Sequence, residues 1–219
     1  MAQIICLANS WKRKDRCIAG IEINTGRWVR PVYPVFSDGR IPPQVRSLNG
    51  REPKILDVID LPLSSNICQS NYALENQQIM PGAWTKIGTV KPIQLVKYTN
   101  FFASILHNTN RCVTVSFLKS LPFHQRRTLQ LIYTSKLEVS ASRKQNGRIK
   151  WKANFVNNFG YKLTDASITD PVFVERLSSG YKPSHPCLLT VSLSLPFCPN
   201  ESCQVDSCWK LIAGVIELY

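Results

Sequence analysis

Aromatic and basic residues gather at residues 11–16, between two expected strands. This segment reads Trp11-Lys12-Arg13-Lys14-Asp15-Arg16. Cations that contact phosphates and rings that stack on bases together bind single-stranded nucleic acid. A loop between strands lies at the rim of a sheet or barrel, where it can reach a ligand. The segment therefore predicts either a nucleic-acid contact or an ordinary solvated basic loop.

Two neighbouring positions carry similar chemistry. Asn9 and Ser10 close the strand before this loop, where they suit either a contact to a base edge or phosphate or a bond to nearby backbone groups. Trp28 and Arg30 lie two residues apart in another expected strand, so their side chains share one face. They suit a stacked base beside an Arg–phosphate contact, or a buried Trp whose Arg shields the barrel end.

A second basic segment alternates charged and apolar residues. Arg148, Lys150 and Lys152 alternate with Ile149, Trp151 and Ala153. In a strand, this alternation puts three cations on one face as a stripe for phosphates, and it puts Trp151 in the core. Tyr161 and Asp170 add possible polar contacts at strand ends. Asp170 precedes Pro171 and serves equally well as a turn former.

Catalytic and metal-binding signatures are weak. The sequence has no Walker motif, GxGxxG, HExxH or paired carboxylates, and its three His fall in no catalytic motif. Cys198, Cys203 and Cys208 are spaced C-x4-C-x4-C, but zinc signatures are usually tighter, so a reduced Cys-bearing loop is favoured over a metal site. We predict no enzyme activity, no cofactor and no metal.

The overall charge favours an anionic partner. The 219 residues include 27 Lys+Arg and 14 Asp+Glu, for a net charge of +13. Residues 86–152 hold thirteen of the basic side chains and one acidic one, interrupted by apolar residues, which indicates a folded basic surface. With 44% hydrophobic residues the chain can bury a core, which excludes a disordered basic tail.

The expected location is the cytoplasm. No run of 18 apolar residues occurs and the N-terminal stretch lacks the pattern of a secretion signal, so neither a membrane span nor export is expected. In that compartment the eight Cys are expected to be reduced. Four of them lie in apolar runs and are expected to pack in the core: Cys6, Cys17, Cys112 and Cys187.

Strand signals outnumber helix signals. The expected strands cover residues 3–9, 16–24, 27–33, 55–63, 88–98, 129–140, 148–156, 161–168, 186–195 and 208–218. Short helices are expected over residues 101–107 and from about Pro122, with Ser120 as cap. The pattern predicts an all-β (β-rich) chain of two small barrels or sandwiches in tandem with short helices between strands, over residues 1–105 and 106–219.

Several segments together resemble a known family. They are Cys6–Ser10, Arg16–Gly20, Thr25–Val32, Pro53–Ile59, Tyr161–Leu163, Thr169–Pro171, Thr190–Leu193 and Cys208–Ile216. In this order they resemble the prokaryotic dual OB-containing domain family, although the Cys-rich residues 198–208 depart from its pattern. The resemblance implies two OB barrels, recognition of nucleic acid or nucleotides, and frequent placement in prokaryotic defence systems. It implies no catalytic residue.

These observations predict a non-catalytic module that binds RNA or single-stranded DNA. The expected setting is a larger prokaryotic ribonucleoprotein or antiviral defence complex with protein partners and no membrane. Two alternatives stay open: an adaptor whose basic face meets an acidic protein, and a sensor or hydrolase of a nucleotide or modified base.

Overall fold

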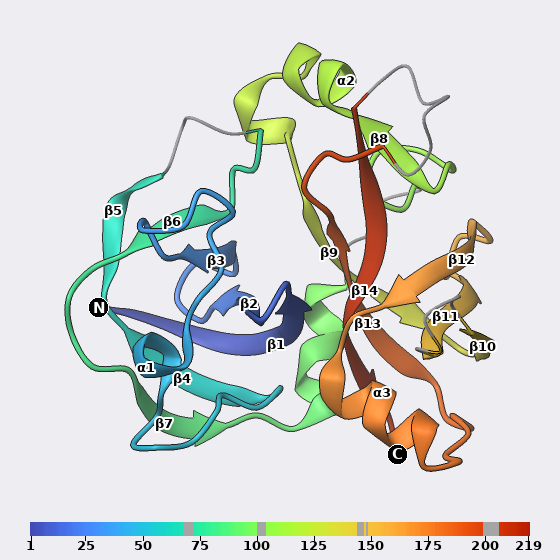
Figure 1. Cartoon of the computed structure of the whole chain (residues 1–219), viewed down its shortest axis with the longest axis horizontal. Coiled ribbons are helices and arrows are strands. Elements are labelled where there is room, and N and C mark those ends of the chain that lie inside the picture. The colour runs from blue at the N-terminus through green and yellow to red at the C-terminus, as the bar shows by residue number, and fades with distance from the viewer. Residues whose placement is uncertain (68–71, 100–103, 144–146, 148, 199–205) are drawn as a thin grey trace. The chain divides into compact units, whose positions relative to one another are not determined.

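The computed structural model describes the chain except for residues 68–71, 100–103, 144–146, 148 and 199–205. The chain divides into two compact units, Met1–Tyr98 and Thr99–Tyr219, each built around a seven-stranded sheet (Figure 1). The predicted all-β class is confirmed. The assignment of one barrel to residues 1–105 and one to residues 106–219 stays a proposal. Within the described residues, no helix is long and apolar enough to cross a membrane.

The first unit is a curled sheet in the order β5-β6-β3-β2-β1-β4-β7. Its strands are β1 (Ala2–Lys12), β2 (Asp15–Glu22), β3 (Trp28–Val32), β4 (Asp57–Leu61), β5 (Leu63–Ile67), β6 (Asn76–Ile79) and β7 (Thr85–Thr89). β1, β2 and β3 form an antiparallel meander, β6 runs parallel to β3, and β4 returns to β1. Because Pro62 alone separates β4 from β5, the chain itself joins the two sides of the sheet. This is the strand order of an OB barrel.

Apolar side chains on the inner faces of these strands fill the first barrel. Ile4, Ile18 and Ile59 are fully buried there, together with Trp84. Gly20 is required at the close approach of β2 to β1, because a Cβ at this position would lie 2.1 Å from the carbonyl oxygen of Ile5. β1 carries a bulge at the same place, which bends the strand around the core.

The second unit repeats the order with its first strand broken in two. It consists of β8 (Cys112–Thr114), β9 (Leu129–Thr134), β10 (Leu137–Arg143), β11 (Ile149–Val156), β12 (Lys162–Ile168), β13 (Cys187–Leu193) and β14 (Ser207–Glu217). β10, β11 and β12 form a meander, β14 runs parallel to β12, and β13 pairs with β14 and β9. Both units therefore have the strand order of OB barrels, as predicted.

Two expected strands are wrong in part. Residues 129–140 form two strands because the chain bends at Ser135 and Lys136, where the Thr134 hydroxyl donates to the Lys136 carbonyl oxygen (2.8 Å). Residues 88–98 contain the end of β7 and then a 3-10 helix, η1 (Pro92–Tyr98). Pro92 suits a helix start, and the side chain of Gln94 accepts from the backbone N–H of Lys91 (2.9 Å). An apolar run is a weak guide to a strand where such signals start a helix.

The expected helices are also displaced. Residues 104–107 are not helical, because Leu106 and His107 adopt left-handed backbone angles (φ 45° and 78°), and residues 101–103 lie outside the described part of the chain. Helix α2 (Val115–Ser120) ends at Ser120 instead of starting there. A three-residue 3-10 helix, η2 (Phe123–Gln125), follows Pro122. In the first unit, the link between β3 and β4 contains one short helix, α1 (Pro43–Arg46).

Helix α3 (Pro171–Ser178) was not expected from the sequence. The buried Asp170 caps it, because its carboxylate accepts from the backbone N–H groups of Val172 (3.0 Å) and Phe173 (3.1 Å). Pro171 at the first helical position completes a normal helix start. α3 links the third and fourth strands of the second barrel, where α1 stands in the first.

Candidate nucleic-acid interface

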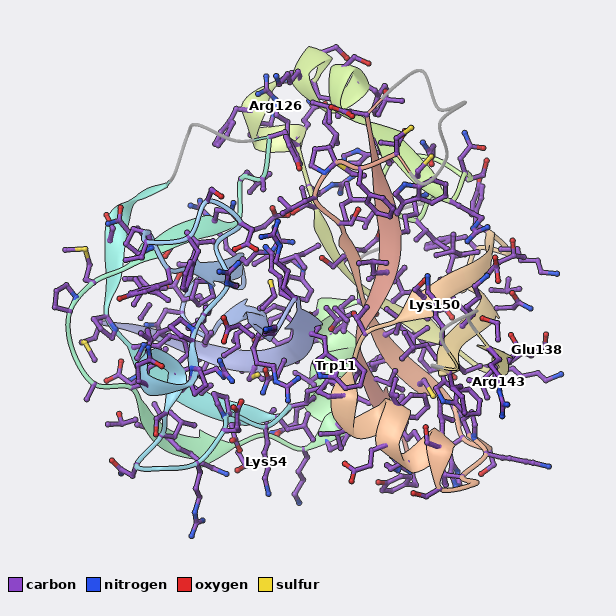
Figure 2. All side chains as sticks on the ribbon, in the orientation of Figure 1. Trp11, Lys54, Arg126, Glu138, Arg143 and Lys150 are labelled. Carbon is purple, nitrogen blue, oxygen red and sulfur yellow. The ribbon has the colours of Figure 1, made fainter. Side chains whose placement is uncertain are left out.

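The predicted basic strand forms part of a partly exposed face in the second unit. Ala153 and Phe155 of β11 are buried in the core. Strand alternation therefore places Lys150 and Lys152 on the other face, where both are partly exposed. Figure 2 marks Lys150 on this strand. The stripe of cations predicted from the sequence is present at these two positions, while Arg148 lies outside the described residues.

Neighbouring strands extend this face. Lys152 pairs with Ser167 of β12, which in turn pairs with Leu211 of β14. Trp209 precedes Leu211 by two residues, so its side chain lies on the same face of the sheet. We call the surface formed by Lys150, Lys152, Ser167, Trp209 and Leu211 the β11–β14 face. It combines cations with an aromatic ring, as single-strand binding requires.

One further ring and one further cation lie beside Trp209. The guanidinium of Arg111 lies 5.7 Å from the Trp209 ring centre, and the ring of Phe197 lies 6.0 Å from it. The Trp209 indole N–H donates to the carbonyl oxygen of Phe197 (3.2 Å), which fixes the ring. Phe197 itself is 49% exposed. We call Arg111, Lys152, Asp165, Phe197 and Trp209 the Trp209 cluster.

An acidic residue holds the cations of this cluster. Asp165 Oδ2 lies 2.7 Å from Lys152 Nζ and 2.9 Å from Arg111 Nη1. The hydrogen bond from Lys152, with the charge of Arg111, lowers the pKa of Asp165 below its ordinary value. The carboxylate therefore stays ionised at neutral pH. Two cations against one carboxylate leave the cluster with a net positive charge.

Sequence reasoning missed Arg111, Phe197 and Trp209 as a group. Arg111 precedes β8, Phe197 lies in the link between β13 and β14, and Trp209 lies in β14. These positions meet only because β8 pairs with β14 and Phe197 pairs with Ser207. The alternation of Trp209 and Leu211 with the buried Cys208 and Lys210 was the one signal in the sequence.

Other predicted residues of the second unit have structural contacts. Trp151 is half-buried and donates from its indole N–H to Ser178 Oγ of α3 (3.0 Å). Tyr161 is half-buried after a turn in which Asn157 Oδ1 accepts from its backbone N–H (2.9 Å). Besides capping α3, Asp170 accepts from the backbone N–H of Val215 (3.1 Å). Buried and bonded in this way, Asp170 offers a ligand no open surface.

The loop predicted in the first unit lies at the tip of the β1–β2 hairpin. Trp11 is 48% exposed and pairs across the hairpin with Arg16, whose guanidinium lies 6.0 Å from the ring centre. Lys14 is exposed at the tip. Arg13 adopts a left-handed backbone angle (φ 56°). This arrangement keeps one ring and one lysine open to solvent.

Acidic residues bind most of the arginines around this hairpin. Arg13 pairs with Asp38 (3.3 Å), and Arg16 lies 3.9 Å from Glu52. The links continue through Arg40, which pairs with Asp15 (3.2 Å) and Asp38 (3.1 Å). We call these residues, with Arg46, the hairpin network. It ties the β1–β2 hairpin to the link between β3 and β4.

Arg46 is the buried centre of the hairpin network. Its side chain is 5% exposed and makes a forked pair with Glu52, with Nε at 2.9 Å and 3.1 Å and Nη2 at 2.7 Å from the carboxylate oxygens. It also donates to the carbonyl oxygen of Ile41. The hydrogen bond from Arg46 lowers the pKa of Glu52, so this pair remains charged. Arginine here holds the fold.

The remaining predicted residues of the first unit are buried or half-buried. Arg30 is 8% exposed and donates to Asn76 Oδ1 (3.2 Å), and Trp28 is half-buried beside it on β3. Burial lowers the pKa of Lys12, with Arg30 among the contributing charges. Asn9 donates to the carbonyl oxygen of Pro53 (2.7 Å), and the buried Ser10 donates to that of Cys17 (3.4 Å). Their contacts match the backbone-bonding role.

The cysteines do not form a metal site within the described residues. Cys198 is disulfide-bonded, so the expectation that every cysteine is reduced is wrong there, and a disulfide sulfur cannot act as a thiolate ligand for zinc. Cys208 is buried in β14, and Cys203 lies outside the described residues. Across the part of the chain that the structure describes, no group of three or more His, Cys, Asp or Glu is placed to hold a metal ion.

Comparison with known proteins bears on the fold. A family model described as the dual OB-containing domain matches residues 2–215. No curated protein and no solved structure was found to match the chain. The matched residues include both units, each of which has the strand order of an OB barrel. The predicted membership is confirmed: the chain belongs to the dual OB-containing domain family.

Proposed function

We propose that this protein is a single-strand nucleic-acid-binding module without catalysis of its own. The observation that carries the proposal is the Trp209 cluster beside Lys150, on a partly exposed sheet face of an OB barrel. OB barrels bind oligonucleotides on the face of their second and third strands, which in this unit are β11 and β12. Cations there contact phosphates, and rings stack on bases.

The binding class follows from the kinds of side chains on the β11–β14 face. Lysine and arginine attract phosphates of any sequence, and stacking requires bases that are not already paired in a duplex. Both features favour a single strand of RNA or DNA. We further propose that the protein acts in the cytoplasm, in a prokaryotic ribonucleoprotein or antiviral complex with protein partners. This part of the proposal rests on the family and on the basic charge.

Salt dependence of binding tests the proposal. A fluorescently labelled single-stranded 12-mer is titrated with the protein from about 50 to 300 mM salt. Affinity is expected to fall steeply, because each phosphate contact on a single strand contributes a slope of about −0.7 to log K against log salt. The double variant Lys150→Glu, Lys152→Glu should weaken binding and flatten this slope by about 1.4.

A matched variant separates local contacts from net charge. Lys54 and Lys91 are exposed lysines of the first unit, so Lys54→Glu with Lys91→Glu changes the net charge equally. It should leave the slope nearly unchanged. Equal slopes for both double variants would place the site elsewhere. Absence of binding to any oligonucleotide at low salt would refute the proposal and favour the adaptor for an acidic protein.

A further inference from the structure

The backbone at Asp165 is held in a rare conformation. Its φ is 59°, in the left-handed region, which residues other than glycine, asparagine and aspartate seldom adopt. The residue lies where the pairing of β11 with β12 shifts register, between Ala153 and Phe155. Such a bulge re-aims a side chain out of the regular alternation of a strand. Strain of this kind concentrates at sites that bind ligands.

Neighbouring side chains stabilise this conformation. The backbone N–H of Asp165 donates to Asn154 Oδ1 (2.8 Å). Its carbonyl oxygen accepts from Arg111 Nη2 (2.9 Å). Both backbone groups therefore have side-chain partners where the strand ladder is interrupted. Two residues outside β12 thus fix the direction of one carboxylate.

The Asp165 carboxylate is partly exposed to solvent. The ion pairs that Lys152 and Arg111 make with this carboxylate are both closest at Oδ2. The side chain is 39% exposed. The ionised carboxylate can only accept hydrogen bonds. A surface that bound only phosphates would not need an exposed carboxylate, because the carboxylate and the phosphates repel each other.

The carboxylate and the aromatic ring are linked by one side chain. The Arg111 guanidinium lies 5.7 Å from the Trp209 ring centre, while its Nη1 lies 2.9 Å from Asp165 Oδ2. A base that stacks on this ring or on the guanidinium therefore brings its edge near the carboxylate. Guanidinium planes stack on bases as aromatic rings do.

We propose that Asp165 is a specificity-determining residue that accepts hydrogen bonds from the Watson–Crick edge of a guanine held in the Trp209 cluster. The proposal rests on the proposed nucleic-acid binding and names the base. Guanine presents two adjacent donors on that edge, the N1 imino and N2 amino groups, and a carboxylate can accept both. Uracil and thymine present one N–H between two carbonyl oxygens, which an anion repels.

The test compares three labelled 12-mers of thymine: one unchanged, one with a central guanine and one with a central hypoxanthine, which lacks the N2 amino group. The wild-type protein should bind the guanine strand about 5- to 100-fold more tightly than the all-thymine strand, the range for a good bidentate contact. Hypoxanthine should fall between them. RNA versions with uracil are measured in parallel.

The variant Asp165→Asn keeps the size of the side chain, and asparagine tolerates the left-handed backbone. It should lose the preference for guanine while binding the all-thymine strand at least as well as the wild type. Glu138→Gln is the matched control, because Glu138 is an exposed acid of the same unit that pairs with Lys136. It removes the same charge and should keep the preference.

The outcomes separate the two proposals. If the wild type binds all three strands equally and Asp165→Asn strengthens binding to each by the same factor, Asp165 merely competes with phosphate and the guanine proposal is wrong, while nucleic-acid binding stands. If no strand binds at low salt, both proposals are wrong. A guanine preference that survives in Asp165→Asn assigns the reading of the base to another residue and overturns the role of Asp165.

Discussion

The two units share a strand order but use their basic side chains differently. In the first, arginines pair with Asp15, Asp38 and Glu52, and Arg46 and Arg30 are nearly buried. In the second, Lys150, Lys152 and Arg111 lie partly exposed on one face, near an aromatic ring. The basic side chains of this protein therefore form two groups: those of the first group stabilise a barrel, and those of the second are placed to contact a ligand.

Equivalent strands show the same contrast. β2 and β3, the second and third strands of the first barrel, carry the buried apolar residues Ala19 and Ile21 and the enclosed Arg30. β11 and β12 occupy the same places in the second barrel and carry Lys152 and Ser167 on a partly exposed face. OB topology supplies a position for a ligand face, but the side chains decide whether that face is available. We expect the second unit to dominate binding.

The largest effect expected is on stability, at Arg46. Arg46→Ala leaves the Glu52 carboxylate without its forked partner and frees the Ile41 carbonyl oxygen, so it should lower the free energy of unfolding by about 2–3 kcal/mol. Urea denaturation measures the change. Oligonucleotide affinity should stay unchanged below the unfolding transition. Arg51→Ala, at an exposed arginine nearby, should cost less than about 0.5 kcal/mol.

The next effect is on binding, at Trp209. A stacked ring contributes about 1–3 kcal/mol per base, so Trp209→Ala should weaken binding to a single strand about 5- to 100-fold. The control Trp151→Phe removes a tryptophan that lies on the core side of β11 and should leave affinity within about twofold. Anisotropy titration at constant salt measures both. Equal losses would indicate that the second barrel is damaged in general and not at a stacking site.

Much of the fold could be predicted because local patterns agree with it. Alternation in residues 148–156 and turn residues such as Gly160 (φ 81°) mark strands without help from distant contacts. The errors fall where start signals for helices compete with apolar runs. Pro92 with Gln94 and Asp170 with Pro171 start helices that a search for strands overlooks.

The candidate site was harder to predict for two physical reasons. The sequence shows that Arg30 is charged, but not that it is buried and donates a hydrogen bond to Asn76, 46 positions away. It also gives no sign that Arg111 meets Trp209, because β8 reaches β14 through a pairing across the unit. Lys150 and Lys152 could be found because their contribution depends on strand alternation alone. Clusters assembled from separate segments need the tertiary structure.

The second unit also contains a buried cation, Lys210, so the difference between the basic residues of the two units is not complete. It donates to the carbonyl oxygen (2.6 Å) and Oδ1 (2.8 Å) of Asn108, and burial lowers its pKa to about 8. Its unfolded pKa is higher, so the unfolded chain binds more protons between pH 8 and 10.5, and stability should rise with pH there. This residue alone should add about 1 kcal/mol to the free energy of unfolding between pH 8.5 and 9.5.

The variant Lys210→Met isolates that contribution. Urea denaturation at pH 8.5 and 9.5 should show a rise in the wild type that exceeds the rise in the variant by about 1 kcal/mol. The comparison with the variant is needed because burial raises the pKa of Cys187 to about 12, which lowers stability above pH 9 in both proteins. Parallel pH profiles would mean that the Lys210 ammonium group titrates normally in the fold.

The smallest effect on binding is expected at Trp11, the tryptophan near the hairpin tip. Its ring has Arg16 beside it, but that arginine faces Glu52, and Arg13 pairs with Asp38, so Lys14 is the main cation left for a phosphate. Trp11→Ala should therefore weaken binding less than about threefold, below the range for a stacked base.

Lys12→Ala with Lys14→Ala should act through charge and lose its effect at high salt. If Trp11→Ala instead weakens binding 5- to 100-fold while Trp209→Ala does not, bases are held at the rim of the first barrel, and the hairpin network then positions a ligand loop as well as stabilising the fold.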